Sequence, residues 1–216
     1  MKAIGRTFET MKKAIIYIHG NGGNAEEAAH YKPLFPDFDV LGFDYKAETP
    51  WDAKNEFTQY FDEISKNYDT VYLIANSIGA FFTMNAQING NIKKAYFISP
   101  ILDMEKLITD MMTWAGVTED ELCEKKEIET QFGETLQWEY LCYVRNNPIE
   151  WNVPTHILYG ENDNLSSYDT VSSFARKIGA TLNMMKCGEH WFHTKEQMDY
   201  LDEWIRDSER TDNLIF

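Results

Sequence analysis

The stretch Val71-Tyr72-Leu73-Ile74-Ala75-Asn76-Ser77-Ile78-Gly79-Ala80 decides how the rest of the chain can fold. Its first five residues are apolar or favour β structure, and the residues after Gly79 have a helical composition. Ser77 therefore stands at a strand-to-helix turn of almost no length. Such a turn forces the serine backbone into a sparsely populated conformation, which requires small residues such as Ala75 and Gly79 two positions away. We expect the Ser77 hydroxyl to stand clear of a sheet, beside the unpaired N–H groups that begin a helix.

The composition fits one folded domain. The chain has 216 residues, of which 44% are hydrophobic and 14% aromatic, and this length supports a single domain with a large core. No run of Gly, Ser and Pro marks a linker. Cys123, Cys142 and Cys187 lack Cys-x-x-Cys spacing, so we expect free thiols rather than a disulfide framework or a zinc site.

The charge of the chain excludes several kinds of partner. A net charge of −15 and a pI near 4.7 disfavour nucleic acid and anionic membrane surfaces. The first apolar run, residues 14–18, is too short for a signal peptide. The chain also lacks a run of about 18 apolar residues, which is the length needed to span a bilayer. We therefore expect a soluble, cytoplasmic protein with no nucleic-acid or membrane partner, and the sequence leaves the oligomeric state open.

Predicted strands and helices alternate along most of the chain. Phe57, Tyr60, Phe61 and Ile64, for example, form one apolar face of a helix over residues 51–67. This alternation predicts an α/β fold with a doubly wound, mostly parallel sheet and helices on both faces. The strands are predicted at residues 14–18, 39–45, 71–75, 95–98, 155–159 and 181–185, with the helix after Ser77 reaching about residue 88, where Asn89-Gly90 would stop it.

Residues 103–151 break this alternation. They contain no convincing strand, are acidic, and have a helical composition with many methionine and aromatic residues. We predict a helical insertion within the single domain of residues 1–216. Most of its large side chains are expected to pack the insertion against the sheet, and its acidic clusters to form a solvated face.

A glycine-rich turn follows the first strand, at His19-Gly20-Asn21-Gly22-Gly23-Asn24. It allows backbone N–H groups to face a cavity, and Asn24 with Glu27 indicates a helix start. A plain connecting loop is the alternative. A phosphate-binding loop would need a Lys followed by Ser or Thr, which is lacking. His19 is expected to brace this turn.

Two further polar residues follow late strands. Asp163 lies in the loop after residues 155–159, where Asn162 and Asn164 could satisfy its remaining lone pairs, and His190 lies in the loop after residues 181–185. With Ser77, they place a hydroxyl, a carboxylate and an imidazole at the carboxyl ends of parallel strands. Asp103 is an alternative acid, although it could equally cap a helix beginning at Met104.

These motifs together resemble the α/β-hydrolase family. The family's Gly-x-Ser-x-Gly elbow is present with Ala75 in place of the first glycine, and the chain order Ser, Asp, His is the family's. The resemblance extends from Ile15 to Ile205 apart from the insertion. It rests also on three loops, His19-Gly20-x-Gly22, Gly160-x-x-Asp163 and Gly188-x-His190-x-Phe192.

The resemblance implies roles for these residues. Ser77 would be the nucleophile, His190 the general base and acid, and Asp163 the carboxylate that orients it, while the backbone N–H groups of Asn21 and Ile78 would form the oxyanion hole. His193, three residues after His190, is expected at the start of the last helix, where Thr194 and Gln197 form a capping box. The insertion would be a cap over the serine, and the residues expected to contact substrate are Met111, Trp114 and Trp191.

The expected function is a serine hydrolase that cleaves a carboxylic ester or related acyl bond of a small molecule without metal or cofactor. Substitution of Met111 or Trp114 should change acyl chain-length preference. Thioesterase and peptidase activities use the same triad and stay open. The alternative is a non-catalytic protein of the same fold that binds a small ligand or a protein partner.

Overall fold

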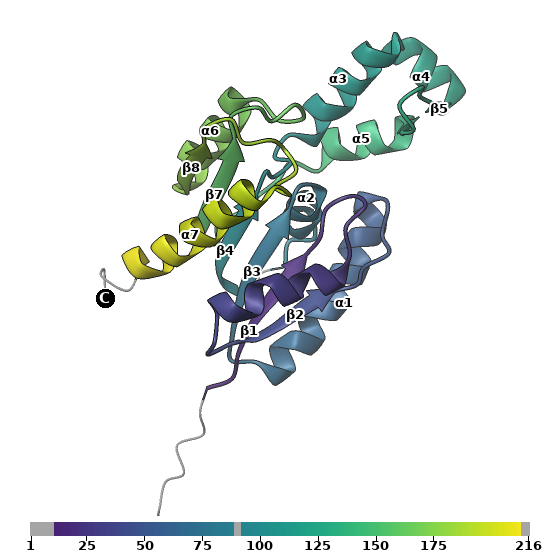
Figure 1. Ribbon diagram of the computed structural model, residues 1–216. Helices are drawn as coiled ribbons and strands as arrows, with labels where there is room; N and C mark the ends of the chain where they lie inside the picture. Colours follow the sequence, from purple (N-terminus) through teal and green to yellow (C-terminus); the bar gives the residue numbers. More distant parts are fainter. Residues whose placement is uncertain (1–10, 89–91, 213–216) are drawn as a thin grey trace, which may run out of the picture.

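A parallel sheet forms the centre of the protein (Figure 1). The computed structural model describes residues 11–88 and 92–212, and within them the sheet has six strands in the order β2-β1-β3-β4-β7-β8. Every pairing in it is parallel, which confirms the predicted doubly wound sheet. The strands are β1 (Lys13–Ile18), β2 (Asp39–Phe43), β3 (Thr70–Asn76), β4 (Ile92–Ile98), β7 (Thr155–Gly160) and β8 (Thr181–Met185).

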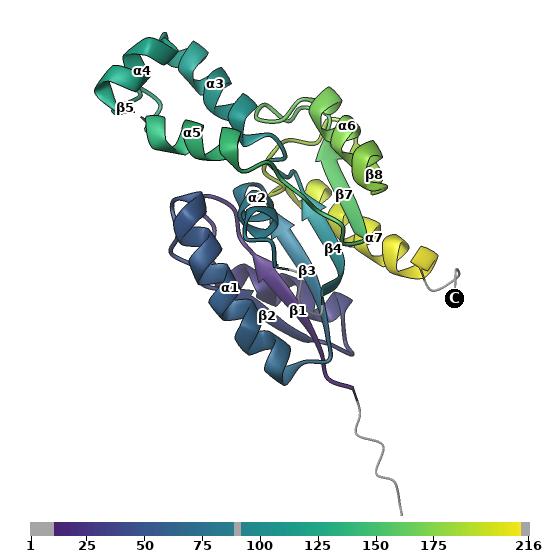
Figure 2. The ribbon, with the colours of Figure 1, turned by 180° about the vertical axis from the view of Figure 1, so that it is seen from behind.

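Helices cover both faces of this sheet, as Figures 1 and 2 show from opposite sides. Alternate residues of β1 enter two different apolar clusters, with Ile16 in one and Ile15 in the other. The first cluster packs under α1 (Pro50–Asn67), α2 (Ile78–Asn85) and α6 (Tyr168–Ile178), and the second under the 3₁₀ helix η1 (Ala25–Leu34) and α7 (Lys195–Asp212). A strand buried on both faces needs a continuous apolar run, which is what β1 and β3 have.

The winding of the chain reverses between β1 and β3. After β1 the chain adds β2 on one side, and it then returns to place β3 on the other side of β1. The loops that leave the carboxyl ends of β1 and β3 diverge at this point, and in open α/β sheets such a switch point is where ligands bind. The glycine-rich turn and Ser77 both lie there.

The insertion lies beyond the carboxyl ends of the strands (Figures 1 and 2). It contains α3 (Met104–Ala115), α4 (Glu119–Lys125), β5 (Glu127–Glu129), β6 (Thr135–Gln137) and α5 (Trp138–Asn146). The antiparallel pair β5–β6 corrects the prediction of a strandless insertion. Its strands are too short to produce a readable period, and the pair is held by burial of Leu136, which is 2% exposed and belongs to the main apolar cluster.

Arg145 ties the helices of the insertion together. From α5, its Nε contacts Glu105 of α3 at 2.7 Å, and its Nη1 and Nη2 contact the two carboxylate oxygens of Glu119 of α4 at 2.6 and 2.9 Å. These hydrogen bonds raise the pKa of Arg145 and lower the pKa of Glu119. The fork geometry fixes the relative orientation of the three helices, although exposed ion pairs each add little stability.

One helix boundary differs from the sequence prediction. Helix α2 ends at Asn85, before the predicted residue 88, and Gln87 has a φ of 52° that no α-helix continues. The predicted stop at residues 89–90 lies outside the described residues. No helix among the described residues is long and apolar enough to cross a membrane.

Candidate active site

Ser77 stands at a strained turn between β3 and α2. Its φ of 50° and ψ of −121° lie in a region that non-glycine residues seldom adopt. The neighbouring backbone explains the need for small residues, because a Cβ on Gly79 would lie 2.4 Å from the carbonyl oxygen of His19. Ala75, on the other side, is completely buried. The predicted strand-to-helix elbow is therefore present, with alanine fitting where the family pattern has glycine.

Ser77, His190 and Asp163 form a continuous hydrogen-bonded chain. The Ser77 Oγ lies 2.8 Å from His190 Nε2, and His190 Nδ1 lies 2.8 Å from Asp163 Oδ2. The Asp163 side chain is 0% exposed and that of His190 is 14% exposed. A carboxylate can only accept, so the imidazole proton stays on Nδ1, and Nε2 is left to accept from the Ser77 hydroxyl. This arrangement can withdraw a proton from Ser77.

The remaining oxygen of Asp163 is satisfied by backbone groups. Asp163 Oδ1 accepts from the N–H groups of Leu165 at 2.8 Å and Ser166 at 2.9 Å. The expectation that Asn162 and Asn164 would supply these bonds is wrong, because the chain turns back over its own carboxylate. Three orienting bonds fix the plane of the Asp163 carboxylate toward His190.

The acid and base loops touch through their backbones. The Asn162 N–H donates to the carbonyl of Gly188 at 2.8 Å. A Cβ on Gly160 would lie 2.5 Å from the carbonyl oxygen of Glu189, so only glycine allows this approach. The distance between Asp163 and His190 is thus set by main-chain packing as well as by their own hydrogen bond.

The glycine-rich turn lies beside Ser77 and is braced by His19. The His19 ring stacks on Tyr45 with centroids 4.2 Å apart, and its Nδ1 donates to the Gly20 carbonyl at 2.9 Å. Within residues 11–88 and 92–212, the N–H groups of Asn21 and Ile78 donate no hydrogen bond. Both residues line the same cavity as Ser77, so the structure brings together the elements of the predicted oxyanion hole.

A cavity of about 670 Å³ opens over Ser77, between the sheet and the insertion. One side of it is apolar and is formed mainly by α3 and the hairpin. The other side is polar and is formed by the loops after β1 and β2, where Lys46 contacts Asp44 at 2.7 Å and lowers the pKa of that carboxyl. The apolar side includes Met104, Leu107, Ile108, Met111 and Leu136.

Only one of the three predicted substrate-contacting residues lines this cavity. Met111 does so. Trp114 is 54% exposed and lies one turn further along α3, where it contacts Phe132. Trp191 is 68% exposed and stacks on His193. The composition of the insertion indicated pocket residues but could not show that α3 extends past the cavity.

Asp103 and His193, the alternatives to Asp163 and His190, have structural contacts. Asp103 caps α3 by accepting from the Lys106 N–H at 2.9 Å. The His193 N–H donates to Gln197 at 3.0 Å, at the start of α7, where Thr194 and Gln197 form the predicted capping box.

Sequence reasoning missed Glu134 and its neighbours. Gly133, Glu134, Thr135, Leu136 and Gln137 line the cavity, because the β5–β6 hairpin carries them over it. The one sequence signal was a polar turn inside the insertion, which is a weak indicator of a hairpin.

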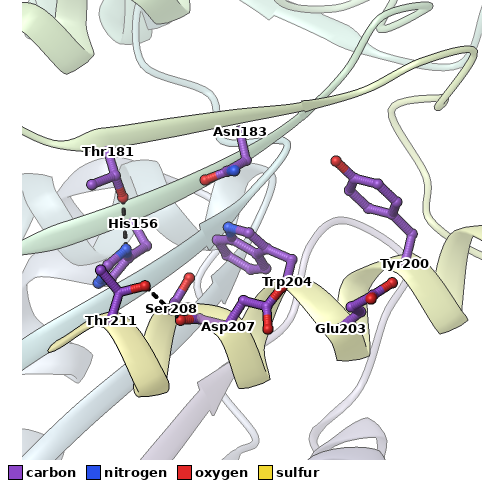
Figure 3. A pocket seen from close by; sticks show the side chains of 9 residues that line it. All are labelled: His156, Thr181, Asn183, Tyr200, Glu203, Trp204, Asp207, Ser208 and Thr211. Carbon is purple, nitrogen blue, oxygen red and sulfur yellow. Dashed lines mark hydrogen bonds between the residues drawn. The ribbon is translucent and has the colours of Figure 1, made fainter. Parts of the chain in front are cut away.

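A second cavity, of about 230 Å³, lies between β8 and α7 (Figure 3). It includes His156 and Thr181, which hydrogen-bond to each other and lie at the amino ends of their strands. Its Asp207 contacts Arg210. This cavity is at the opposite end of the sheet from Ser77. Among the residues that the structure describes, no cluster of side chains could hold a metal ion.

Comparison with known proteins agrees with this architecture. Residues 71–196 match the family model described as "Serine aminopeptidase, S33", whereas no curated protein matches the chain.

Several solved structures share the fold at low sequence identity. Est1E from Butyrivibrio proteoclasticus has a TM-score of 0.71 and 17% identity, with 94% of this chain and 88% of that chain covered. Alpha/beta hydrolase domain-containing protein 10 from mouse has a TM-score of 0.73 and 16% identity, with 92% and 90% covered. The thioesterase domain from the curacin biosynthetic pathway has a TM-score of 0.54 and 14% identity, with 90% and 91% covered. Because the family model matches more than half of the chain, the protein belongs to the α/β-hydrolase family, in the group that the serine aminopeptidase S33 model describes.

Proposed function

We propose that the protein is a serine hydrolase that cleaves a carboxylic ester or a related acyl bond through an acyl-enzyme on Ser77. The observation that carries this proposal is the hydrogen-bonded chain from Ser77 Oγ through His190 to Asp163, with 2.8 Å at each link. A serine hydroxyl is a poor nucleophile unless a positioned base removes its proton. A part-buried chain of this kind at the switch point of the sheet supplies that base.

The reaction follows from these positions. Ser77 Oγ attacks the substrate carbonyl while His190 Nε2 takes the hydroxyl proton, and Asp163 stabilises the resulting imidazolium. The N–H groups of Asn21 and Ile78 would then donate to the oxygen that becomes negative. Collapse of the tetrahedral intermediate breaks the acyl bond as Nε2 returns the proton to the leaving group. A water molecule, which gives its proton to the same imidazole, then attacks the acyl-enzyme and forms a second tetrahedral intermediate. Collapse of this intermediate releases the acid and regenerates the Ser77 hydroxyl.

The cavity favours an apolar acyl group without negative charge. Its apolar side under α3 suits a hydrocarbon chain. Its polar side carries the carboxylates of Asp44 and Glu48 against the ammonium of Lys46, and the hairpin adds the carboxylate of Glu134, so an anionic substrate would meet repulsion. The same residues could act on thioesters or amides, so a panel of p-nitrophenyl esters, neutral thioesters and aminoacyl substrates identifies the acyl bond.

Labelling with a fluorophosphonate probe tests the nucleophile without knowledge of the substrate. We expect one labelled site, mapped by mass spectrometry to Ser77, and no labelling of a folded Ser77→Ala protein. Labelling that survives in Ser77→Ala would refute the assignment. A folded wild type that is neither labelled nor active on the panel would favour the non-catalytic, ligand-binding alternative.

Met111 is expected to control acyl chain length. Met111→Ala deepens the cavity, and each extra CH₂ of substrate buried there is worth about 0.8 kcal/mol. Burial of one or two more CH₂ groups should therefore raise the ratio of kcat/KM for long over short esters about 4- to 15-fold. Trp114→Ala, on the same helix but outside the cavity, serves as the control and should leave the ratio unchanged. If the two variants behave alike, the cavity is not the acyl site.

A further inference from the structure

The insertion contacts the glycine-rich turn through Glu134. The Asn21 side-chain Nδ2 donates to Glu134 Oε1 at 3.3 Å, joining residues 113 positions apart. Both residues line the cavity over Ser77. Asn21 is also the residue whose backbone N–H is proposed to bind the oxyanion. One side chain of the insertion is therefore bonded to the residue whose peptide orientation the reaction depends on.

The backbone of Glu134 is firmly held within the hairpin turn. Its carbonyl accepts from the Thr130 N–H at 2.8 Å and from the Thr130 hydroxyl at 2.6 Å, and its own N–H donates to that hydroxyl at 3.1 Å. The following strand is anchored by the buried Leu136. The hairpin thus fixes the backbone from which the exposed Glu134 side chain reaches the turn.

The glycine-rich turn is held at its two ends and by a hydrogen bond within it, from the Gly23 N–H to the Gly20 carbonyl at 3.1 Å. His19 holds the Gly20 carbonyl at one end. At the other end, Glu27 accepts from the Asn24 N–H at 3.3 Å and from the hydroxyl of Tyr17. Between these braces, Gly22 has a φ of 74° and no neighbour that a Cβ would touch. The bonds from His19 and Gly23 to the Gly20 carbonyl hold the peptide that carries the Asn21 N–H. The Asn21 side-chain bond to Glu134 is the restraint that the insertion adds.

We propose that Glu134 is a positioning residue that helps to hold the Asn21 N–H toward Ser77, so that the contact between the insertion and the glycine-rich turn supports the oxyanion hole. This role rests on the proposed function. A hydrogen bond of this kind acts on the transition state, because the Asn21 N–H matters most when negative charge develops on the substrate oxygen. The effect should therefore fall on kcat rather than on KM.

Four variants test this role: Glu134→Ala, Glu134→Gln, Asn21→Ala and the double alanine variant. The measurements are kcat and KM on the best ester of the panel, and the second-order rate of Ser77 labelling by a fluorophosphonate, whose phosphoryl oxygen also enters the hole. Glu129→Ala is the matched control, because it removes the same charge from the same hairpin at an exposed residue that does not line the cavity.

We expect Glu134→Ala to lower kcat and the labelling rate about 3- to 10-fold, the range of one net hydrogen bond, with KM nearly unchanged. Glu134→Gln should restore most of the rate, because its amide oxygen can still accept from Asn21. Asn21→Ala keeps its backbone N–H but loses the bond to Glu134, so it should cost the same factor, and the double variant should cost no more than either single one.

Other outcomes would overturn the positioning role. Rates of Glu134→Ala equal to those of Glu129→Ala would do so, as would additive losses in the double variant. A change confined to KM would instead make Glu134 a substrate contact. If the wild-type protein is labelled at Ser77 and hydrolyses ester, these results leave the proposed function intact. A folded wild type that is neither labelled nor active would remove both proposals together.

Discussion

Replacing His190 by alanine is expected to lower kcat by about 10⁶, the loss produced when the histidine of a serine-protease triad is removed. His190 Nε2 lies 2.8 Å from Ser77 Oγ, and no other imidazole contacts that hydroxyl among the described residues. Without it the hydroxyl keeps its proton, and the leaving group has no acid to protonate it. The rate of ester hydrolysis and the rate of fluorophosphonate labelling should fall together, while the melting temperature stays close to that of the wild type.

His193→Ala is the matched control for this experiment. Its ring lies in the same loop but donates to the carbonyl of Trp191 at 2.7 Å and contacts Glu189 at 3.8 Å. It should therefore retain most of the activity. If His193→Ala is inactive and His190→Ala retains activity, the base has been assigned to the wrong residue of the loop.

The second large effect is expected at Asp163. In Asp163→Asn, one oxygen remains to accept from the N–H groups of Leu165 and Ser166, so the new amide nitrogen faces His190 Nδ1. A donor at that position makes Nδ1 an acceptor and transfers the ring proton to Nε2, where it can no longer receive the Ser77 proton. The same change in a serine-protease triad lowers kcat by about 10⁴, and we expect a loss of that order here, measured as kcat in a folded variant.

Asp103→Asn provides the comparison for the acid. Asp103 caps α3 rather than facing His190, and asparagine is an equally good capping residue, so both the rate and the stability should change little. Asp103→Ala removes the cap and should cost about 1 kcal/mol of the free energy of unfolding while sparing kcat. An inactive but folded Asp103→Asn protein, beside an active Asp163→Asn protein, would show that the acid is Asp103, after β4, and not Asp163, after β7.

The sequence predicted the sheet and the placement of the candidate site because both depend on local signals. The apolar runs of β1 and β3 are long enough to show burial on both faces, and Ala75 and Gly79 mark the turn that exposes Ser77. The approach of Asp163 and His190 then follows from topology, since the carboxyl ends of parallel strands share one edge of the sheet.

The insertion was less predictable because its structure depends on tertiary contacts. The β5–β6 hairpin is stabilised by burial of Leu136, which no local pattern reveals, and Glu134 reaches the cavity only through that hairpin. Trp114 has the composition of a pocket residue, but its position relative to the cavity depends on how far α3 projects. The backbone bonds of Asp163 likewise depend on the path of a loop rather than on residue type.

Among the described strands, β8 lies at the edge of the sheet and pairs with β7 alone, and four of its five residues are partly or fully exposed. His190 follows this strand, whereas Ser77 follows the central β3. Edge strands open at a lower free energy than central ones. On warming, brief detachment of β8 would carry His190 away from Ser77 while the rest of the sheet stays folded. The upper temperature of the proposed activity would then be set by this edge and lie below that of global unfolding.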